Sequence, residues 1–511
     1  MSGLSLAISA AACFNPGIPP IDGGDEIDGS SDSETDTGST TDSGSTTDTT
    51  DGTCAQEGCS CGGPGACDPG LYCFEGSCIV GVCGDATTQG PEDCDDGNAV
   101  DGDGCDSDCS FTEVMAIAAS RRNSCALIEG GRVRCWGAND VGQLGYGNVQ
   151  TIGDDESPAA AGDVMLPEFA VELALGDVHG CVRMVDKGLR CWGSAAGGRL
   201  GFGNGNDIGD DETPLATTDV PVGNDVVGLA AGASHNCARF GGGQLRCWGV
   251  GLGGRLGYGN LENIGDDELP ADAGDVMVGG PVLAQAAGDA HTCAIMVSGA
   301  VRCWGTGAGG RLGYGNTSDI GDNESPASAG EVSAVPQGLP PVTPVTALAL
   351  GSDMSCARFE GGAVSCWGGN GSGQLGRGDS QSIGDDELPS VQQPMALPGP
   401  ALAIAAGRAH VCALLEGGDV LCWGENGSGQ LGLGHTQNIG DDELPTAGGF
   451  VDLGGPAVAV TAGGDHSCAL LGMSNEVLCW GENLDGQLGL GHTETIGDDE
   501  VPSDAGPIAL F

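Results

Sequence analysis

Hydrophobic and polar positions alternate in a pattern that recurs from about residue 112 to the C-terminus. One copy makes the pattern clear. Residues 401–407 (ALAIAAG) are a run of small apolar side chains, and residues 410–424 (HVCALLEGGDVLCWG) alternate around a Glu-Gly-Gly turn. Alternation with a period of two around a glycine-rich turn is typical of an antiparallel β-hairpin. Residues 430–434 (QLGLG) and 439–445 (IGDDELP) are rich in turn formers and predict loops.

Seven copies of this pattern follow one another. Every tryptophan of the chain lies in a Cys-Trp-Gly triplet, and successive tryptophans are 56, 56, 56, 63, 56 and 57 residues apart. Units of this length suit a four-stranded propeller blade and are too long for one coil of a solenoid. The sequence therefore predicts an all-β fold, a seven-bladed β-propeller, over residues 111–511. The tryptophans are Trp136, Trp192, Trp248, Trp304, Trp367, Trp423 and Trp480.

Each predicted hairpin carries two cysteines. In six hairpins the cysteines are ten residues apart, which places them directly opposite each other across a three-residue turn, within disulfide reach. The last pair is eleven apart and fits a four-residue turn at Gly472–Asn475. Buried free thiols are the alternative, but seven matched pairs favour one disulfide per blade. The predicted pairs are Cys125 with Cys135, Cys181 with Cys191, Cys237 with Cys247, Cys293 with Cys303, Cys356 with Cys366, Cys412 with Cys422 and Cys468 with Cys479.

Ten further cysteines fall within residues 54–110 and predict a small disulfide-rich module, because so short a segment has little apolar core. Their connectivity stays open. Residues 83–109 (CGDATTQGPEDCDDGNAVDGDGCDSDC) resemble a cysteine-rich repeat common in myxobacterial surface proteins. A cluster of oxygen ligands in this stretch is a candidate calcium site, with solvated turn residues as the alternative. These ligands are Asp95, Asp96, Asn98, Asp101 and Asp103.

The N-terminus predicts export. Residues 1–12 are interpreted as a partial signal peptide that ends before Cys13, which we expect to be lipidated as in bacterial lipoproteins. An incidental cysteine in an apolar N-terminus is the alternative. Residues 13–53 continue into a linker of Ser, Thr, Asp and Gly that cannot bury enough apolar surface to fold. We expect this linker to hold the rest of the chain away from a surface.

Composition narrows the function. The chain has 72 acidic and 16 basic residues, a net charge of −56, which disfavours nucleic acid and anionic lipid as partners. Twenty-five cysteines in a regular spacing favour an oxidising compartment. No apolar run approaches the ~20 residues of a membrane span. We therefore expect a bacterial protein that is secreted or displayed on the outer surface, with membrane contact only through a lipid anchor.

The seven units resemble the regulator of chromosome condensation repeat. The resemblance rests on Ala-Ala-Gly before His-x-Cys-Ala-Leu, then Cys-Trp-Gly and Gly-Gln-Leu-Gly, as at His410, Trp423 and residues 429–432. It covers about 400 residues and implies a seven-bladed propeller. The best-known activity of this family, nucleotide exchange on a small GTPase, is then an alternative function. We also expect residues 506–511 to add a strand to the blade begun by residues 114–119, closing the ring.

Two repeated features are candidate sites. Five histidines (His179, His235, His291, His410 and His466) share one position that holds Asn123 and Met354 in the other repeats, and we expect mainly a structural role. The motif Ile-Gly-Asp-Asp-Glu recurs seven times, once as Ile-Gly-Asp-Asn-Glu, and supplies twenty carboxylates that repeat symmetry places in a ring on one face. Such a ring could attract cations or a basic partner, with turn chemistry as the alternative. Representative triplets are Asp154, Asp155, Glu156 and Asp441, Asp442, Glu443.

Variable segments are better candidates for specific recognition, because exact repetition favours a structural role. The longest insertion lies at residues 335–346 (VPQGLPPVTPVT), and its prolines reduce the entropy lost on binding. We expect a monomeric binding or adhesion scaffold for a protein or glycan ligand, basic or cation-bridged, with calcium the one cofactor considered. The sequence has no GxSxG, HExxH or phosphate-binding loop. A site assembled from scattered loops keeps an enzyme as a further alternative.

Overall fold

The computed structural model describes residues 72–74, 77–79, 94–95, 98, 104–107 and 109–511. Two compact units divide the described chain, one ending at Thr112 and one beginning at Glu113. In the first unit β1 (Tyr72–Phe74) pairs with β2 (Ser77–Ile79), and Cys94 forms a disulfide with Cys105. The expected signal peptide, Cys13 and the linker lie outside the described residues. Asp96, Asp101 and Asp103 also lie outside them, so the calcium site stays a prediction.

Within the described residues, Glu113–Phe511 forms seven antiparallel sheets of three strands each, which confirms the seven-bladed propeller. In chain order the blades are β3 (Val114–Ala119), β4 (Asn123–Ile128), β5 (Arg132–Gly137); β6 (Ala170–Gly176), β7 (His179–Met184), β8 (Leu189–Gly193); β9 (Val226–Ala231), β10 (His235–Phe240), β11 (Leu245–Gly249); β12 (Val282–Ala287), β13 (His291–Met296), β14 (Val301–Gly305); β15 (Val345–Leu350), β16 (Met354–Phe359), β17 (Val364–Gly368); β18 (Ala401–Ala406), β19 (His410–Leu415), β20 (Val420–Gly424); β21 (Ala457–Ala462), β22 (His466–Leu471), β23 (Val477–Gly481).

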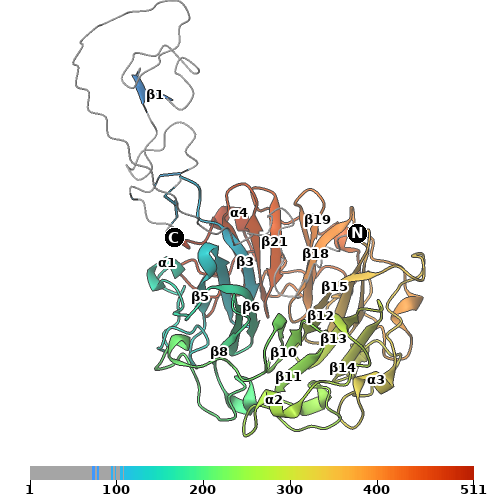
Figure 1. Ribbon diagram of the computed structural model, residues 1–511. Coiled ribbons are helices and arrows are strands. Elements are labelled where there is room, and N and C mark those ends of the chain that lie inside the picture. Colours follow the sequence, from blue (N-terminus) through green and yellow to red (C-terminus); the bar gives the residue numbers. More distant parts are fainter. Residues whose placement is uncertain (1–71, 75–76, 80–93, 96–97, 99–103, 108) are drawn as a thin grey trace, which may run out of the picture. The chain divides into compact units, whose positions relative to one another are not determined.

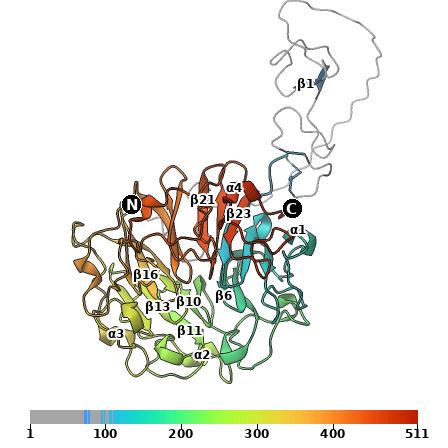
Figure 2. The ribbon, with the colours of Figure 1, turned by 180° about the vertical axis from the view of Figure 1, so that it is seen from behind.

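Short helical turns lie in the loops between strands. Four one-turn helices begin at the proline that ends the Ile-Gly-Asp-Asp-Glu-x-Pro motif, a residue suited to the first helical position. These helices lie at the periphery of the ring (Figures 1 and 2). They are α1 (Pro158–Ala161), α2 (Pro270–Ala273), α3 (Pro326–Ala329) and α4 (Pro502–Ala505). The 3-10 turns are η1 (Glu129–Gly131), η2 (Ala196–Gly198), η3 (Pro214–Ala216), η4 (Leu252–Gly254), η5 (Ala308–Gly310), η6 (Pro389–Val391) and η7 (Pro445–Ala447).

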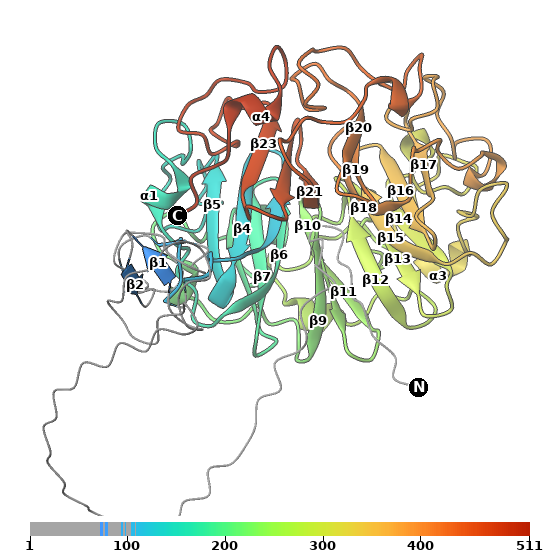
Figure 3. The same ribbon diagram turned by 90° about the horizontal axis from the view of Figure 1, so that it is seen from above.

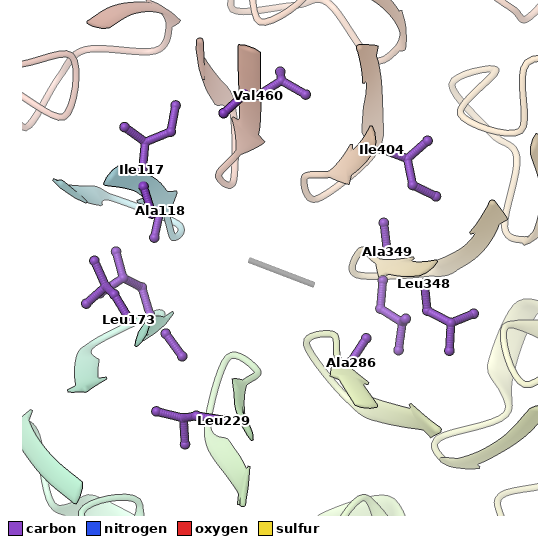
Figure 4. Packing of buried hydrophobic residues seen from close by; sticks show 14 of the residues in the cluster. Ile117, Ala118, Leu173, Leu229, Ala286, Leu348, Ala349, Ile404 and Val460 are labelled. Atoms are coloured by element: carbon purple, nitrogen blue, oxygen red, sulfur yellow. The ribbon is translucent and has the colours of Figure 1, made fainter. Parts of the chain in front are cut away.

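The first strand of each blade lies innermost. Figure 4 shows buried first-strand residues, from Ile117 round to Val460, arranged about a common centre. Successive first strands contact each other, including β21 with β3 where the ring closes. Small side chains such as Ala118 and Ala286 occupy this crowded ring, which is why the sequence there contains runs of alanine. The tryptophans are fully buried farther out in the same core.

A disulfide links the second and third strands of every blade. The two cysteines of each hairpin are directly opposite in register, and their Cα atoms are 4.0–4.1 Å apart. In the last hairpin, one extra turn residue is absorbed by Asn475, which has a positive φ of 55°. The predicted pairing is therefore confirmed in all seven hairpins. The bonds are Cys125 with Cys135, Cys181 with Cys191, Cys237 with Cys247, Cys293 with Cys303, Cys356 with Cys366, Cys412 with Cys422 and Cys468 with Cys479.

Each blade lacks the fourth strand that we predicted. Within the described residues, a single bridge pairs the glycine of Cys-Trp-Gly with the isoleucine of the acidic motif, as in Gly137 with Ile152. The bridge cannot extend because the next residue, Gly153, has a φ of 97° and turns the chain away.

The C-terminal tail adds no strand to the blade begun by β3, so that prediction was wrong. Ile508 donates its backbone N–H to the Val477 carbonyl oxygen, as Val164 does to Val133 in blade one. The tail thus follows the outer strand of blade seven, whereas β3 is an inner strand. The tail still reaches blade one, because the Leu510 carbonyl accepts a hydrogen bond from Arg134 of β5.

Strand direction defines two ends for every blade. First and third strands run the same way, so the loops after first strands, the Gly-x-Leu-Gly loops and the acidic loops share one end, which we call the acidic face. The hairpin turns between second and third strands lie at the opposite end, which we call the turn face. Blade seven lies beside blade one (Figure 3).

Candidate functional site

The five repeated histidines join neighbouring blades. Each side chain is fully buried, and its Nε2 atom lies within hydrogen-bond distance of a hydroxyl or amide oxygen on the next blade. Where the histidine is absent the partner is absent too: Met354 faces blade six, which has Val411 at that position. The pairs are His179 with Asn236 (3.0 Å), His235 with Thr292 (2.8 Å), His291 with Ser355 (2.8 Å), His410 with Ser467 (2.9 Å) and His466 with Ser124 (2.8 Å).

These contacts fix the protonation state of the imidazoles. The Ser467 hydroxyl donates its single proton to the Gln430 carbonyl oxygen (3.1 Å), so it accepts from the Nε2–H of His410. Burial lowers the pKa of His410 to about 3, with a further contribution from the positive charge of Arg408. Burial likewise lowers the pKa of His179 to about 4 and that of His466 to about 3. Neutral, solvent-inaccessible imidazoles cannot serve an external ligand, so their role is structural.

Contacts between blade seven and blade one close the ring. Trp136 Nε1 donates to the Gln487 carbonyl oxygen of blade seven at 2.9 Å, and Gly464 N–H donates to the Ser120 oxygen of blade one at 2.9 Å. Blades seven and one are therefore joined by the contacts that join other neighbours, with no exchanged strand. Gly463 is required beside His466 because a Cβ atom there would overlap the ring and the Ser120 oxygen.

The acidic loops also contact their neighbours. The glycine of each acidic motif packs directly on the first glycine of the preceding Gly-x-Leu-Gly loop: Gly209 lies on Gly142, and both have positive φ. This close approach explains why the Ile-Gly part of the motif repeats so exactly. In six of the motifs three acidic residues follow; they are partly or fully exposed and could supply metal ligands within 4.8 Å of one another, as at Asp154, Asp155 and Glu156.

Crowding of these carboxylates raises the proton affinity of the glutamate in the motif. Burial, and a hydrogen bond that the protonated Glu156 donates to Asp155, raise the pKa of Glu156 to about 7. In the next blade the pKa of Glu212 is raised to about 7, first by a hydrogen bond to Asp211 and second by burial. The Asp441–Asp442–Glu443 loop follows the same pattern, because burial and Asp442 raise the pKa of Glu443. The loops of Glu156 and Glu212 therefore carry fewer than three negative charges near pH 7, and their charge becomes more negative as the pH rises through this range.

The insertion between blades four and five forms a cavity on the turn face. The cavity has a volume of about 720 Å³ and is lined by the hairpin turn Ser298–Val301, by residues 331–337, 339 and 341–345, and by Ser390. The insertion is held by a backbone bond from Gln337 N–H to the Gln392 oxygen (2.8 Å). Prolines at four positions of the insertion fix its φ angles, and Val342 is 87% exposed at the rim. This volume is typical of ligand pockets.

One polar cluster escaped the sequence interpretation. Beside the axis, Glu172 of blade two is buried and accepts a hydrogen bond from Arg183 Nε at 2.7 Å and from the Leu229 N–H of blade three at 3.1 Å. The position of Glu172 holds alanine in five other blades and Gly228 in blade three. Comparison of the repeats column by column would have revealed this difference.

The comparisons agree with this architecture. Profiles described as the regulator of chromosome condensation (RCC1) repeat match residues 115–143, 402–430 and 457–487, and also residues 361–414 and 417–470. The Ultraviolet-B receptor UVR8 of Arabidopsis thaliana is 30% identical over 384 residues, covering 75% of this chain and 80% of that protein. This chain belongs to the RCC1 repeat family.

Other RCC1 repeat proteins match a similar share of the chain. The mitochondrial RCC1 domain-containing protein RUG3 of Arabidopsis thaliana is 30% identical over 379 residues, covering 70% of this chain and 78% of that protein. The human E3 ubiquitin-protein ligase HERC2 is 30% identical over 328 residues, which cover 63% of this chain and only 6% of HERC2. The match to HERC2 therefore concerns its repeats and does not bring its ligase activity.

Solved structures with the same fold include yeast RCC1 (Prp20), crystallised with Kap60. It superposes with a TM-score of 0.56 at 19% identity, covering 77% of this chain and 84% of that one. Human WBSCR16 gives a TM-score of 0.56 at 19% identity, covering 73% and 93%. At these identities the likeness establishes the RCC1 propeller fold alone. In the described residues no helix is long and apolar enough to cross a membrane.

Proposed function

We propose that this RCC1 repeat protein is an exported, non-enzymatic scaffold that binds a protein partner at the cavity between blades four and five. The insertion at residues 335–346 is the observation that carries the proposal. It lengthens one repeat spacing from 56 to 63 residues, and it lines the cavity on the turn face. A propeller whose blades are otherwise matched has its specific surface where one blade differs from the others.

The chemistry of the cavity favours a protein over a glycan. Its lining contains valines, prolines and Leu339 but no aromatic ring, whereas glycan sites commonly offer rings for sugars to stack on. A partner would insert an apolar side chain beside Val342, and the prolines keep the entropic cost of ordering the rim low. The Glu331 carboxylate at the wall favours a partner with a basic group next to its apolar anchor.

Export is proposed on the strength of the cysteines. Seven hairpin disulfides would be reduced in an ordinary cytosol, and they suit a secreted or surface-displayed chain. Lipidation at Cys13 and display on a bacterial outer surface are part of the proposal. A free-thiol count and an intact mass on protein from its native host test this part. No free thiols with an acylated Cys13 would support it, and many free thiols on an unprocessed chain would refute it.

Nucleotide exchange on a small GTPase is the second candidate. Prp20p, whose structure was described with its binding to Gsp1p and histones, is a protein-binding propeller of the same fold. Disulfides in every blade make an intracellular GTPase a poor partner for this chain. Nucleotide release from a small GTPase, measured with and without this chain, distinguishes the two functions.

Site-specific photo-crosslinking tests the binding surface. A photo-reactive amino acid is placed at Val342, on the cavity rim, or at Met473, in the hairpin turn of blade seven. The two positions are 87% and 86% exposed, so they report equally on chance encounters. We expect a discrete adduct on native host cells from position 342 and none from position 473. Equal labelling from both positions, or none from either, would contradict the proposal.

A shortened variant completes the test. Deleting residues 335–341 restores the 56-residue spacing of the other repeats and removes five of the eighteen residues that line the cavity. We expect this variant to keep its disulfides and thermal stability but to lose the partner captured through position 342 of the parent. Retained binding would place the partner elsewhere on the propeller.

A further inference from the structure

Blade three has no carboxylate at the position equivalent to Glu172. In blade two, Glu172 lies opposite Arg183 and accepts its Nε–H at 2.7 Å. The corresponding pair in blade three is Gly228 opposite Arg239. The arginine is retained in blade three and the carboxylate is missing.

The donors around the missing carboxylate are still present. A Cβ atom built on Gly228 would lie 3.1 Å from Arg239 Nη2, 3.3 Å from Arg239 Nε and 3.3 Å from Gln285 Nε2. Gln285, on the first strand of blade four, is only 3% exposed, and among the described residues its Nε2 atom has no hydrogen-bond partner. An unpaired buried amide is costly, and this one lies beside the side-chain position of Gly228, which the Arg239 guanidinium now crowds.

Arg239 is poorly paired for a guanidinium in this environment. Within the described part of the chain no carboxylate lies within ion-pair distance of it, and its two hydrogen bonds, to Gln285 Oε1 and to the Val227 oxygen, are both 3.3 Å long. Arg183 makes a 2.7 Å ion pair at the equivalent place. Burial lowers the pKa of Arg239, and the negative charge of Glu172, which already pairs with Arg183, only partly offsets this effect.

We propose that the seam between blades three and four binds a carboxylate group beside the propeller axis, with Arg239 and Gln285 as its donors. The ligand takes the place that the Glu172 carboxylate occupies in blade two. When the ligand binds, the Arg239 side chain moves away from Gly228 into the conformation that Arg183 has in blade two. The ligand carboxylate then accepts a hydrogen bond from Gln285 Nε2. The ligand is a single narrow carboxylate, either a small free acid or an acidic side chain of a partner.

This site is separate from the cavity on the turn face and does not depend on it. Gly228 does not have a positive φ, so a side chain is compatible with the backbone there, as the alanines of other blades show. A covalent version of the ligand can therefore be built as Gly228→Glu, which copies blade two. The Arg239→Leu variant copies blades one, six and seven, where Leu127, Leu414 and Leu470 occupy this position.

The experiment titrates the full chain with carbon-13 acetate at constant ionic strength, replacing chloride, and follows acetate line width and the melting temperature. We expect saturable binding to the parent and affinity at least tenfold weaker for Arg239→Leu and for Gly228→Glu. Gly228→Glu should also melt higher than the parent without acetate. Arg377→Leu is the control, because it removes the same charge where blades six and seven have Leu433 and Leu490. It should bind acetate like the parent.

Blocked glutamate, with its amino and carboxyl termini capped, is titrated in parallel. Tighter binding than acetate identifies an acidic side chain as the ligand, and weaker binding identifies a small free acid. No saturable binding to the parent would overturn the proposal. Equal binding to the parent and to Gly228→Glu would also overturn it, since the slot of that variant is already filled.

Discussion

The histidine that joins blades six and seven can be exchanged for a pair that the protein already uses elsewhere. His410 donates to Ser467, whereas one blade earlier Met354 faces Val411. The double substitution His410→Met with Ser467→Val therefore copies a natural seam. Gly407, next to His410, leaves the same room that Gly351 leaves beside Met354, so the methionine fits sterically.

Each single substitution should destabilise the seam, and the double substitution should recover part of the loss. Ser467→Val leaves the His410 Nε2–H buried without an acceptor, at a cost of about 1–3 kcal/mol. His410→Met removes one hydrogen bond from Ser467, which is worth about 1 kcal/mol because its bond to the Gln430 oxygen remains. In the double variant no donor is left unpaired. We expect a coupling free energy of about 1–2 kcal/mol between the two positions.

The same substitution changes how stability depends on pH. The pKa of His410 is about 3 in the folded protein, against about 6.5 when unfolded. The unfolded chain therefore binds one more proton than the folded chain below pH 6.5, and stability falls as the pH falls toward 3. At pH 4.5, two units below the unfolded value, this histidine costs about 2.7 kcal/mol. Relative to the parent, the double variant should gain that amount between pH 8 and pH 4.5.

Calorimetric melting of four proteins, with disulfides intact, tests both effects. Parent, two single variants and the double variant are compared at pH 8 and pH 4.5, so that the other titrating groups cancel in the differences. Additive losses at pH 8 would refute the pairing of His410 with Ser467. A double variant whose stability follows the pH dependence of the parent would refute a neutral buried imidazole at this position.

Three further predictions concern stability. Replacing both Cys412 and Cys422 by alanine should lower the melting temperature by removing up to about 2–3 kcal/mol of loop-closure stabilisation, and calorimetry on oxidised protein would measure it; an unchanged melting temperature would show that the hairpin needs no bridge. Gly463→Ala should destabilise the closure of the ring strongly, because its Cβ would overlap His466 and the Ser120 oxygen, whereas Gly427→Ala, in open space, should not; equal melting temperatures would contradict the packing of the seam. Glu156→Gln should stabilise the protein at pH 8 and not at pH 5, because a carboxyl whose folded pKa is raised to about 7 loses stability as the pH rises from about 4.5 through 7; the opposite pH dependence in parallel melts would refute the raised pKa.

Much of the fold could be predicted because its signals are local and repeated. Blade number follows from seven tryptophans, and hairpin register follows from cysteines ten residues apart, as at Cys412 and Cys422. The missing fourth strand could not be predicted, since it depends on the positive φ of glycines such as Gly153. The prediction for the C-terminal tail also failed, because sequence periodicity alone does not show which strand of the blade lies innermost.

The candidate sites were predictable to different degrees. The insertion at residues 335–346 broke a regular spacing and could be found by counting, but the cavity beneath it depends on contacts with Ser298 and Ser390 that no local pattern encodes. The carboxylate slot involves Gly228 and Gln285, 57 residues apart on neighbouring blades. An absent side chain gives no motif. Only the comparison of equivalent positions across blades, where Glu172 stands out, could have pointed to it.

Several departures from repeat symmetry lie on one arc of the ring. Blades two, three and four carry Gly-Gly-Arg-Leu-Gly, whereas the other four blades have Gln at the position of this arginine. The guanidiniums of Arg255 and Arg311 donate to backbone oxygens in the loop after the first strand of the next blade. The vacant carboxylate slot lies at the seam between blades three and four, and the cavity follows blade four. Blades six and seven depart least from one another. Since the symmetric contacts already account for closure of the ring, binding is the simplest physical reason for these differences in blades two to five. A partner that docks on this arc would have both the apolar cavity and the basic slot within its reach, which a partner on blades six and seven would not.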